Sequence, residues 1–397
     1  MRQHIFLHLI FLLLSSDLAI SQVNSSINKN QYGLSEKSVQ WMREATIQQL
    51  SGCRVEGKNG IWIHTPDGVG NYKALWTRDF YYMVEYAADL MDPKEIKASI
   101  HYILNGQRED GCIPDRINVD GKAIYSPGAD HSPLADHALD NGPFMAMLVS
   151  SYVKQFEDET LFRAVEGRLR RGLDFISREE SGLVYNDPKK PQCVYGFTDT
   201  VKKTGNLLFE SLIYYKACRE MEELCRLYKY GNPDIYKSRS ENIQKNIHKL
   251  MDGESGMFWA ADIDCKQIDI WGSAYAVKIG ITTIDQSKRI SEYLISNTNK
   301  IFMRGQIRHL PESDSVWNNL FISVPVGTYQ NGAYWATPLA WVVPVIAMQD
   351  LPLAKKILGD VIKDFQENGI NECINTDYIK IPNYVASATN VYFLTRQ

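Results

Sequence analysis

Two carboxylates in contrasting settings are the residues with the clearest potential for chemistry. Asp199 ends the segment Tyr195-Gly196-Phe197-Thr198-Asp199, whose aromatic side chains would desolvate the carboxyl group and raise its pKa. Glu372 stands close to Asn371 and Asn375, in a polar setting that favours the ionised form. A protonated and an ionised carboxyl group form the usual pair for general acid and general base catalysis. We therefore predict that Asp199 is an acid and Glu372 a base.

Each of these carboxylates also has a simpler explanation when it is considered alone. Asp199 precedes a predicted helix, and an Asp in that place commonly caps the free amides of the first turn. Glu372 precedes another predicted helix, where a solvated loop side chain is the simpler interpretation. The two residues become candidates for one site because both stand before helices of a regular series.

The series consists of twelve segments in which apolar residues recur at helical spacing, separated by breaks rich in Gly, Pro and Asn. The predicted helices span residues 35–51, 79–91, 93–108, 139–156, 159–178, 204–229, 233–251, 270–280, 285–298, 331–348, 352–368 and 384–395. Prolines that fit the first turn of a helix support three of the starts, at Pro93, Pro233 and Pro352. Few segments alternate as strands do, and residues 182–185 and 256–259 are at most short hairpins.

Every second helix of the series opens with a cluster of polar and aromatic residues. The clusters are Trp76-Thr77-Arg78-Asp79, Asp140-Asn141-Gly142-Pro143, Gly196-Phe197-Thr198-Asp199, Asp269-Ile270-Trp271-Gly272, Tyr329-Gln330-Asn331-Gly332-Ala333-Tyr334-Trp335 and Asn371-Glu372-Cys373-Ile374-Asn375. If the even helices form an inner ring of parallel neighbours and the odd helices return outside them, all six clusters meet at one end. We therefore predict an all-α fold in which residues 33–397 form one (α/α)6 barrel of six helical hairpins, with short β-hairpins in its loops. Polar loop residues on such a scaffold are where function is expected.

The composition and the first residues bear on partners and location. The 397 residues include 43 basic and 47 acidic side chains and no long basic run, so nucleic acid is not an expected partner. Arg2 and His4 precede an apolar run over residues 5–14 and the tripeptide Ala19-Ile20-Ser21, which is the layout of a secretory signal peptide. We predict cleavage after Ser21 and a secreted or lumenal protein without a membrane anchor. An uncleaved membrane anchor is the alternative, although a run this short would span a bilayer poorly. Residues 22–32 would form a short N-terminal extension, which carries a glycosylation sequon at Asn24.

The cysteines and histidines give weaker signals. Seven cysteines follow the predicted cleavage site, and in an oxidising compartment we expect one or two disulfides among buried residues. Neither their pairing nor the oligomeric state follows from the sequence. The densest group of acids and histidines, Asp130-His131 and Asp136-His137 with Asp140 beyond, lacks the spacing of a helical zinc site. We expect no metal and no other cofactor.

The order of the motifs resembles that of the six-hairpin (α/α)6-barrel glycosidases, such as glucoamylase, trehalase and the amylo-glucosidase part of glycogen-debranching enzyme. These enzymes have a Trp-x-Arg-Asp motif early in the barrel, and residues 76–79 are similar to it. They also have a carboxylic acid before the sixth helix and a Glu shortly before the last one, and the positions of Asp199 and Glu372 resemble these. The resemblance covers nearly the whole of residues 33–397.

The resemblance implies that two facing carboxyl groups cleave a glycosidic bond, with Asp199 protonating the leaving oxygen and Glu372 activating water. Arg78 and Asp79 would then bind vicinal hydroxyl groups through charge-assisted hydrogen bonds, although a buried structural ion pair is the alternative. The remaining candidates for substrate binding are the aromatic side chains of Trp76, Trp271, Tyr334 and Trp335, which offer faces for stacking, and the polar side chains of Asp136, Asp140, Asn141 and Asn331.

The implied function is an inverting, exo-acting α-glycosidase that releases terminal α-linked sugars from oligosaccharides or glycans, with glucose favoured over mannose. Two other classes of protein stay open. A sugar epimerase or polysaccharide lyase on the same barrel would rely on a His or Tyr base, and most histidines stand outside the six clusters. A carbohydrate-binding relative without turnover would keep the pocket and need neither Asp199 nor Glu372 as a catalyst.

Overall fold

The computed structural model describes residues 31–314 and 316–397. The predicted signal peptide, residues 1–21, lies outside the described residues, as does nearly all of the predicted extension over residues 22–32. Signal cleavage after Ser21 and the sequon at Asn24 therefore stay predictions. Within the part of the chain that the structure describes, no helix is long and apolar enough to cross a membrane.

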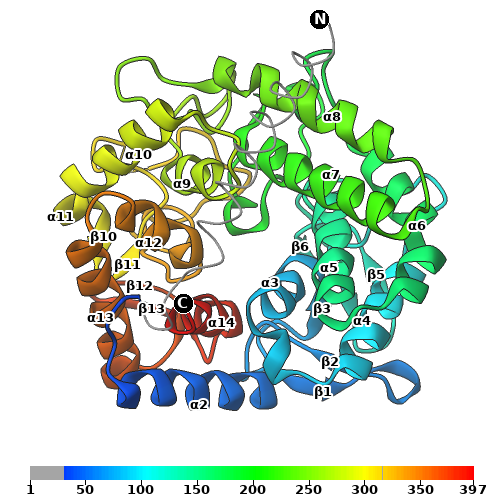
Figure 1. Cartoon of the computed structure of the whole chain (residues 1–397), viewed down its shortest axis with the longest axis horizontal. Helices are drawn as coiled ribbons and strands as arrows, with labels where there is room; N and C mark the ends of the chain where they lie inside the picture. Colours follow the sequence, from blue (N-terminus) through cyan, green and yellow to red (C-terminus); the bar gives the residue numbers. More distant parts are fainter. Residues whose placement is uncertain (1–30, 315) are drawn as a thin grey trace, which may run out of the picture.

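The described residues form a closed ring of helices (Figure 1). The inner helices are α3 (Thr77–Ala87), α5 (Asn141–Phe156), α7 (Leu208–Tyr228), α9 (Ile270–Lys278), α12 (Leu339–Ala347) and α14 (Val385–Thr395). Each inner helix packs against the next, and α14 packs against α3, which closes the ring. Nearly every residue of α3 and α5 is buried, as expected for helices that are covered on all sides.

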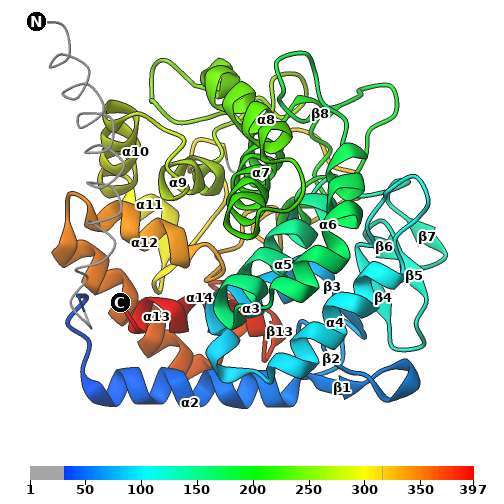
Figure 2. The same ribbon diagram turned by 45° about the vertical axis from the view of Figure 1, so that its right-hand side comes forward.

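Six further helices surround this ring. They are α2 (Glu36–Gly52), α4 (Pro93–Asn105), α6 (Glu159–Asp174), α8 (Pro233–Asn246), α10 (Ile284–Ser296) and α13 (Leu351–Asn368). Figure 2 shows α2 along the outside of the barrel, beside α13 and beyond α14. The outer helices are amphipathic: α6 buries Leu161, Phe162, Val165 and Leu169, while Arg163, Arg170 and Arg171 are exposed. The all-α (α/α)6 barrel predicted from the sequence is confirmed.

Two helix starts differ from the predicted ones by four residues or more, because short stretches of extended pairing intervene. The tenth predicted helix begins at Leu339 rather than at residue 331, since Tyr334 and Trp335 pair by backbone with Ile374 and Ile307. Helix α7 begins at Leu208 rather than at residue 204, since strand β9 (Gly205–Asn206) pairs with β8 (Tyr185–Asn186). A one-turn helix, α11 (Thr298–Ile301), was not expected.

Small antiparallel hairpins fill the loops, and two of them lie beside the cavities described below. One sheet joins β3 (Ala74–Trp76), β4 (Arg116–Asn118) and β5 (Ala123–Ile124), and a hairpin joins β12 (Asn371–Asn375) to β13 (Tyr378–Pro382). Neither was predicted. The remaining pairs are β1 (Arg54–Glu56) with β2 (Trp62–His64), β6 (Gly128–Ala129) with β7 (Ser132–Pro133), and β10 (Phe302–Met303) with β11 (Gln306–Ile307). Residues 256–259, expected as a short hairpin, form only isolated bridges.

The expectation of one or two disulfides is wrong in this structure. All seven cysteines are buried and unpaired. Burial in apolar surroundings is common for free cysteines, and it raises the pKa of thiols such as Cys112 to about 12. The cysteines therefore act as small packing residues of the core.

Candidate active site

Two neighbouring cavities lie at the end of the barrel where the inner helices begin. The inner cavity is lined by Pro66, Tyr72, Trp76, Arg78, Asp79, Gly196, Phe197, Asp199, Tyr329, Glu372 and Tyr384. The outer cavity shares Tyr72, Trp76, Asp199 and Tyr329 with it and adds residues such as Lys73, Arg116 and Lys380. The inner cavity offers about 30 Å³ to the centres of water-sized molecules, and the outer one about 640 Å³. The inner space as it stands holds about two waters.

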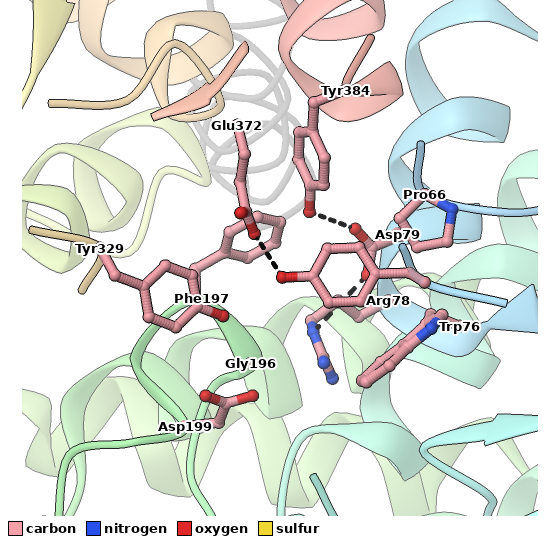
Figure 3. A pocket seen from close by; sticks show the side chains of 11 residues that line it. Pro66, Trp76, Arg78, Asp79, Gly196, Phe197, Asp199, Tyr329, Glu372 and Tyr384 are labelled. Carbon is pink, nitrogen blue, oxygen red and sulfur yellow. Dashed lines mark hydrogen bonds and ion pairs between the residues drawn. The ribbon is translucent and has the colours of Figure 1, made fainter. Parts of the chain in front are cut away.

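The carboxyl groups of the inner cavity come from three separate segments. Figure 3 shows Asp199 and Glu372 on opposite walls, with Asp79 beside Arg78 between Tyr384 and Trp76. Asp79 lies in the first turn of α3, Asp199 follows a 3-10 turn over Gly196–Thr198, and Glu372 lies on β12. These three carboxyl groups are each less than a tenth exposed. The barrel thus gathers acids from distant parts of the chain into one desolvated space.

Arg78 lines the inner cavity and interacts with several carboxylates at once. Its Nη1 donates to Asp115 Oδ1 at 2.9 Å and lies 3.4 Å from Asp140 Oδ2, and its Nε lies 3.9 Å from Asp79 Oδ2. The guanidinium packs directly on Gly196, where an added Cβ would lie only 1.7 Å from the Arg78 Nε. Only glycine fits at that position. The Arg78 network is therefore structural as well as part of the cavity wall.

The neighbours of Arg78 explain why the helix begins with Trp-Thr-Arg-Asp. Thr77 Oγ1 donates to the carbonyl of Pro114 and the Thr77 amide to the carbonyl of Asp115, which ties the start of α3 to the loop before β4. Trp76 pairs with Arg116 across the β3–β4 ladder. The Arg116 guanidinium lies 4.6 Å from the centre of the Trp76 ring, within cation–π range. The Trp76 Nε1 is buried and makes no hydrogen bond within the described residues, so it is available to a ligand.

Asp79 accepts a hydrogen bond of 2.6 Å from the Tyr384 hydroxyl. Burial raises the pKa of Asp79, while the charge of Arg78 and the bond from Tyr384 oppose that rise. The Arg78–Asp79 pair is thus buried and also lines the cavity. A structural ion pair and a role in binding sugar hydroxyls are therefore compatible.

Asp199 is positioned by one buried amide, Gln330. The Gln330 Nε2 donates to Asp199 Oδ1 at 2.9 Å and to the carbonyl of Gly196 at 3.0 Å. Its Oε1 accepts from both the amide and the hydroxyl of Thr200. Burial raises the pKa of Asp199 to about 6, and the charge of Arg78 and the bond from Gln330 hold it from rising further. The rise expected from the sequence is present, and burial is its main cause.

Glu372 has a different set of partners. Its Oε1 accepts a 2.8 Å hydrogen bond from the Tyr72 hydroxyl, and its Oε2 lies 3.4 Å from the Lys380 Nζ. Burial raises the pKa of Glu372 to about 7, against the charge of Lys380 and the bond from Tyr72. The expectation that polar sequence neighbours favour the ionised form of Glu372 is therefore wrong, because burial outweighs them and Asn371 bonds to the carbonyls of Asn368 and Gly369 instead.

Seven of the predicted substrate-binding residues do not line the inner cavity. Asp140 and Asn141 lie beneath it, where Asp140 accepts from the amide of Gly196 and Asn141 donates to the carbonyl of Ile113. Asn331 bonds to the backbone of Trp317 and Val324. The others are Asp136, exposed and paired with Lys190; Trp271, fully buried against His309; Trp335, fully buried against Phe197; and Tyr334, paired by backbone with Ile374.

The sequence interpretation also missed residues that do line the cavity. Tyr329 belongs to a cluster that was singled out, but its neighbours were chosen instead, and Tyr384 only marks the start of the last predicted helix. Tyr72 and Pro66 stand in the loop before β3, which carries no recognisable motif. Lys380 stands on an unpredicted strand. Each of these residues is recognised as part of the site only by its contacts with residues from distant segments of the chain. The sequence around it gives no sign of those contacts.

No group of three or more His, Cys, Asp or Glu side chains in the described ranges is arranged to hold a metal ion. Asp130 bonds to Arg116 and Asn118, and His137 packs against Phe175. None of the histidines in the described ranges lines either cavity.

Several solved structures have a fold similar to that of this chain. A rhamnosidase from Klebsiella oxytoca with rhamnose bound aligns with a TM-score of 0.67 and 14% identity over 94% of this chain and 66% of that one. A mannosylglycerate hydrolase from Thermus thermophilus in complex with glucose aligns with a TM-score of 0.65 and 15% identity over 89% of this chain and 100% of that one. An uncharacterized conserved protein from the same organism aligns with a TM-score of 0.66 and 14% identity, with the same coverage. The sequence matches no family model and no curated protein.

These likenesses show the fold. The chain is an (α/α)6 barrel of the six-hairpin type found in the rhamnosidase and the mannosylglycerate hydrolase. The resemblance to six-hairpin glycosidases drawn from the sequence is thereby confirmed at the level of the fold.

Proposed function

We propose that the protein is a glycoside hydrolase in which Asp199 is the general acid and Glu372 the general base. The observation that carries this assignment is where the two carboxyl groups lie. Asp199 lines both cavities, whereas Glu372 lines only the inner one. A sugar in the inner cavity with its leaving group in the outer one has Asp199 at the bond between them. Glu372 then faces the sugar from the other side, where a water attacks.

The hydrogen bonds of the two carboxyl groups support these roles. Glu372 Oε2 is buried, and its partner among the described residues is the Lys380 Nζ at 3.4 Å. A carboxylate oxygen with one such partner can still accept a hydrogen bond from a water. The raised pKa of Asp199, about 6, lets it keep a proton in mildly acidic solution, where an ordinary aspartate has lost it. The raised pKa of Glu372 makes it a stronger base when it is ionised.

The finer assignment is an inverting, exo-acting enzyme for α-linked sugars, with glucose favoured over mannose, acting as a secreted or lumenal protein. A narrow inner cavity that opens into a wide outer one favours a single terminal residue in the inner site. Because Tyr72 and Tyr329 line both cavities, they must turn aside for a sugar ring to enter. Inversion requires about 6.5–9.5 Å between the carboxyl groups, to leave room for the water.

The cavity disfavours an epimerase or lyase. The bases of such enzymes are His or Tyr, and the described histidines lie away from both cavities. Tyr72, Tyr329 and Tyr384 line the inner cavity, but burial raises the pKa of each hydroxyl well above its ordinary value. A tyrosine in this setting does not ionise readily enough to abstract a proton from carbon. Both carboxylates needed for hydrolysis are present, which disfavours a binding protein without turnover.

The test is hydrolysis of a panel of α-gluco- and α-manno-oligosaccharides by the protein from residue 22 onward. The panel also includes α-rhamnosides and an α-mannosyl glycerate, for which the structural neighbours are named. Proton NMR would identify the released monosaccharide and its first-formed anomer. Release of one monosaccharide as the β-anomer is expected for a D-gluco- or D-manno-substrate. Binding without release, or release of the α-anomer, would contradict the proposal.

A further inference from the structure

The Lys380 ammonium lies among the side chains that surround Glu372. Its Nζ is 3.4 Å from Glu372 Oε2, donates to the Tyr72 hydroxyl at 3.5 Å and lies 3.7 Å from the centre of the Tyr329 ring. The Lys380 side chain is 24% exposed, whereas that of Glu372 is 2% exposed. The cation therefore lies between the outer cavity and the buried carboxylate, where screening by solvent is weak.

The strand that carries Lys380 is distorted at the point where it passes Glu372. Pairing of β12 with β13 joins Asn371 to Pro382 and Cys373 to Lys380, and it is interrupted between these pairs, opposite Glu372. Ile381, which follows Lys380, has a φ of +38°. A β-branched residue rarely adopts this left-handed conformation, and holding it there costs stability. A regular hairpin would avoid that cost, so the distortion is consistent with a requirement on where Lys380 points.

We propose that Lys380 is a positioning residue that holds Glu372 as an ionised carboxylate, aimed into the inner cavity. This inference rests on the proposed role of Glu372 as the base. Without a cation beside it, a carboxyl group so deeply buried would hold its proton at neutral pH and could not activate water. Lys380 supplies this charge from the outer cavity, which its side chain lines.

The other groups that face Glu372 act in both directions. The Tyr72 hydroxyl stabilises the carboxylate by its hydrogen bond, while the charge of Asp79 opposes ionisation. The remaining groups are the neutral hydroxyls of Tyr329, Tyr378 and Tyr384 and the thiol of Cys373, each with a pKa raised by burial. Lys380 is therefore the charged group that favours ionisation of Glu372 most strongly.

The experiment isolates Glu372 by working in the Asp199→Asn background with an α-glycosyl fluoride, whose leaving group needs no acid. The pH profile of kcat/KM should then rise along a single limb that reports the base. Adding Lys380→Met should move that limb to higher pH, by about one unit or more. Activity below pH 6 should then fall about tenfold or more, while activity at high pH is retained. Lys380→Arg should restore the limb.

Lys73→Met is the matched control, because Lys73 lines the outer cavity and forms no ion pair with Glu372. It should leave the limb in place. An unmoved limb in Lys380→Met, or an equal movement in Lys73→Met, would overturn the proposal. A carbon-13 NMR titration of the Glu372 carboxyl, assigned by comparison with Glu372→Gln, needs no turnover. It tests Lys380 even if the chain hydrolyses none of the glycosides, an outcome that would contradict the proposed function instead.

Discussion

The Asp199 loop and the Glu372 hairpin bury a carboxyl group to a similar degree but bond to it through different groups. A neutral amide, from Gln330, bonds to Asp199. A phenol and an ammonium, from Tyr72 and Lys380, surround Glu372. A neutral donor orients a carboxyl group without forcing it to ionise, whereas a cation favours the charged form. Because the charge of Arg78 also lowers the pKa of Asp199, to about 6 against about 7 for Glu372, the partners alone do not divide acid from base. That division rests on position: Asp199 lines both cavities, whereas Glu372 lines only the inner one.

The largest expected effect is that of Glu372→Gln, which removes the base and keeps the volume of the side chain. Hydrolysis should fall about 100-fold or more on both a natural glycoside and a glycosyl fluoride, because neither reaction proceeds without an activated water. Steady-state kinetics on the two substrates measures this. A variant that keeps full activity on either substrate would remove Glu372 from the chemistry.

The same variant reports on folding. The folded-state pKa of Glu372, about 7, lies above its ordinary value, so the folded state binds the extra proton between about pH 4.5 and pH 7. Stability from this group is present at low pH and is lost as the pH rises through 7. Glu372→Gln should therefore be more stable than the wild type at pH 8, by about 1–3 kcal/mol, and equally stable at pH 4. Chemical denaturation at the two pH values tests this.

The next largest effect is expected from Arg78, whose charge acts on both Asp79 and Asp199 in the wall of the inner cavity. Arg78→Ala leaves Asp79, Asp115 and Asp140 without their shared cation, and loss of one partner of a buried pair costs about 3–5 kcal/mol. A lower melting temperature together with lost activity is expected. An unchanged melting temperature with lost activity would show that Arg78 serves only the ligand, and unchanged activity would exclude it from the site.

A residue of this site could be predicted from the sequence where a local motif marks its position, and not where its role depends on contacts with distant segments. The helices, and the positions of Asp199, Glu372, Arg78 and Asp79, follow from periodicity and from motifs at helix entrances. Trp271 and Trp335 stand in similar motifs but fill the core, because an aromatic residue at the start of an inner helix can point to either side. Lys380 was missed because its contact with Glu372 depends on the short hairpin that pairs β13 with β12. The turn of that hairpin carries no strong sequence signal.

A smaller effect is expected from Gln330→Met, which removes the donor to Asp199 and leaves the size of the side chain similar. The pKa of Asp199 should rise, because one hydrogen bond to its ionised form is lost. On a natural glycoside the falling limb of the pH profile should then move to higher pH by up to about one unit. Gln330→Glu is a useful contrast, since a second carboxylate should raise the limb further. A limb that stays in place in both variants would show that Gln330 only packs.

The smallest effect should come from Tyr72→Phe, because Lys380 still faces Glu372 after the hydroxyl is lost. One hydrogen bond to a charged group contributes about 1.5–3 kcal/mol at most, and part of that is recovered from water at the rim. The rising limb of the pH profile should move upward by less than in Lys380→Met. A larger movement than that of Lys380→Met would make Tyr72, and not Lys380, the main support of the ionised carboxylate.

The most direct test of the division between the two carboxyl groups is the activity of Asp199→Asn on two substrates that differ only in their leaving group. Hydrolysis of the natural glycoside, whose leaving oxygen needs a proton, should fall about 100-fold or more, while hydrolysis of the glycosyl fluoride of the same sugar should be largely kept. The falling limb of the pH profile on the fluoride should also vanish, and the rising limb should remain. Equal losses on the two substrates, or full activity on the natural one, would contradict the assignment of Asp199 as the acid.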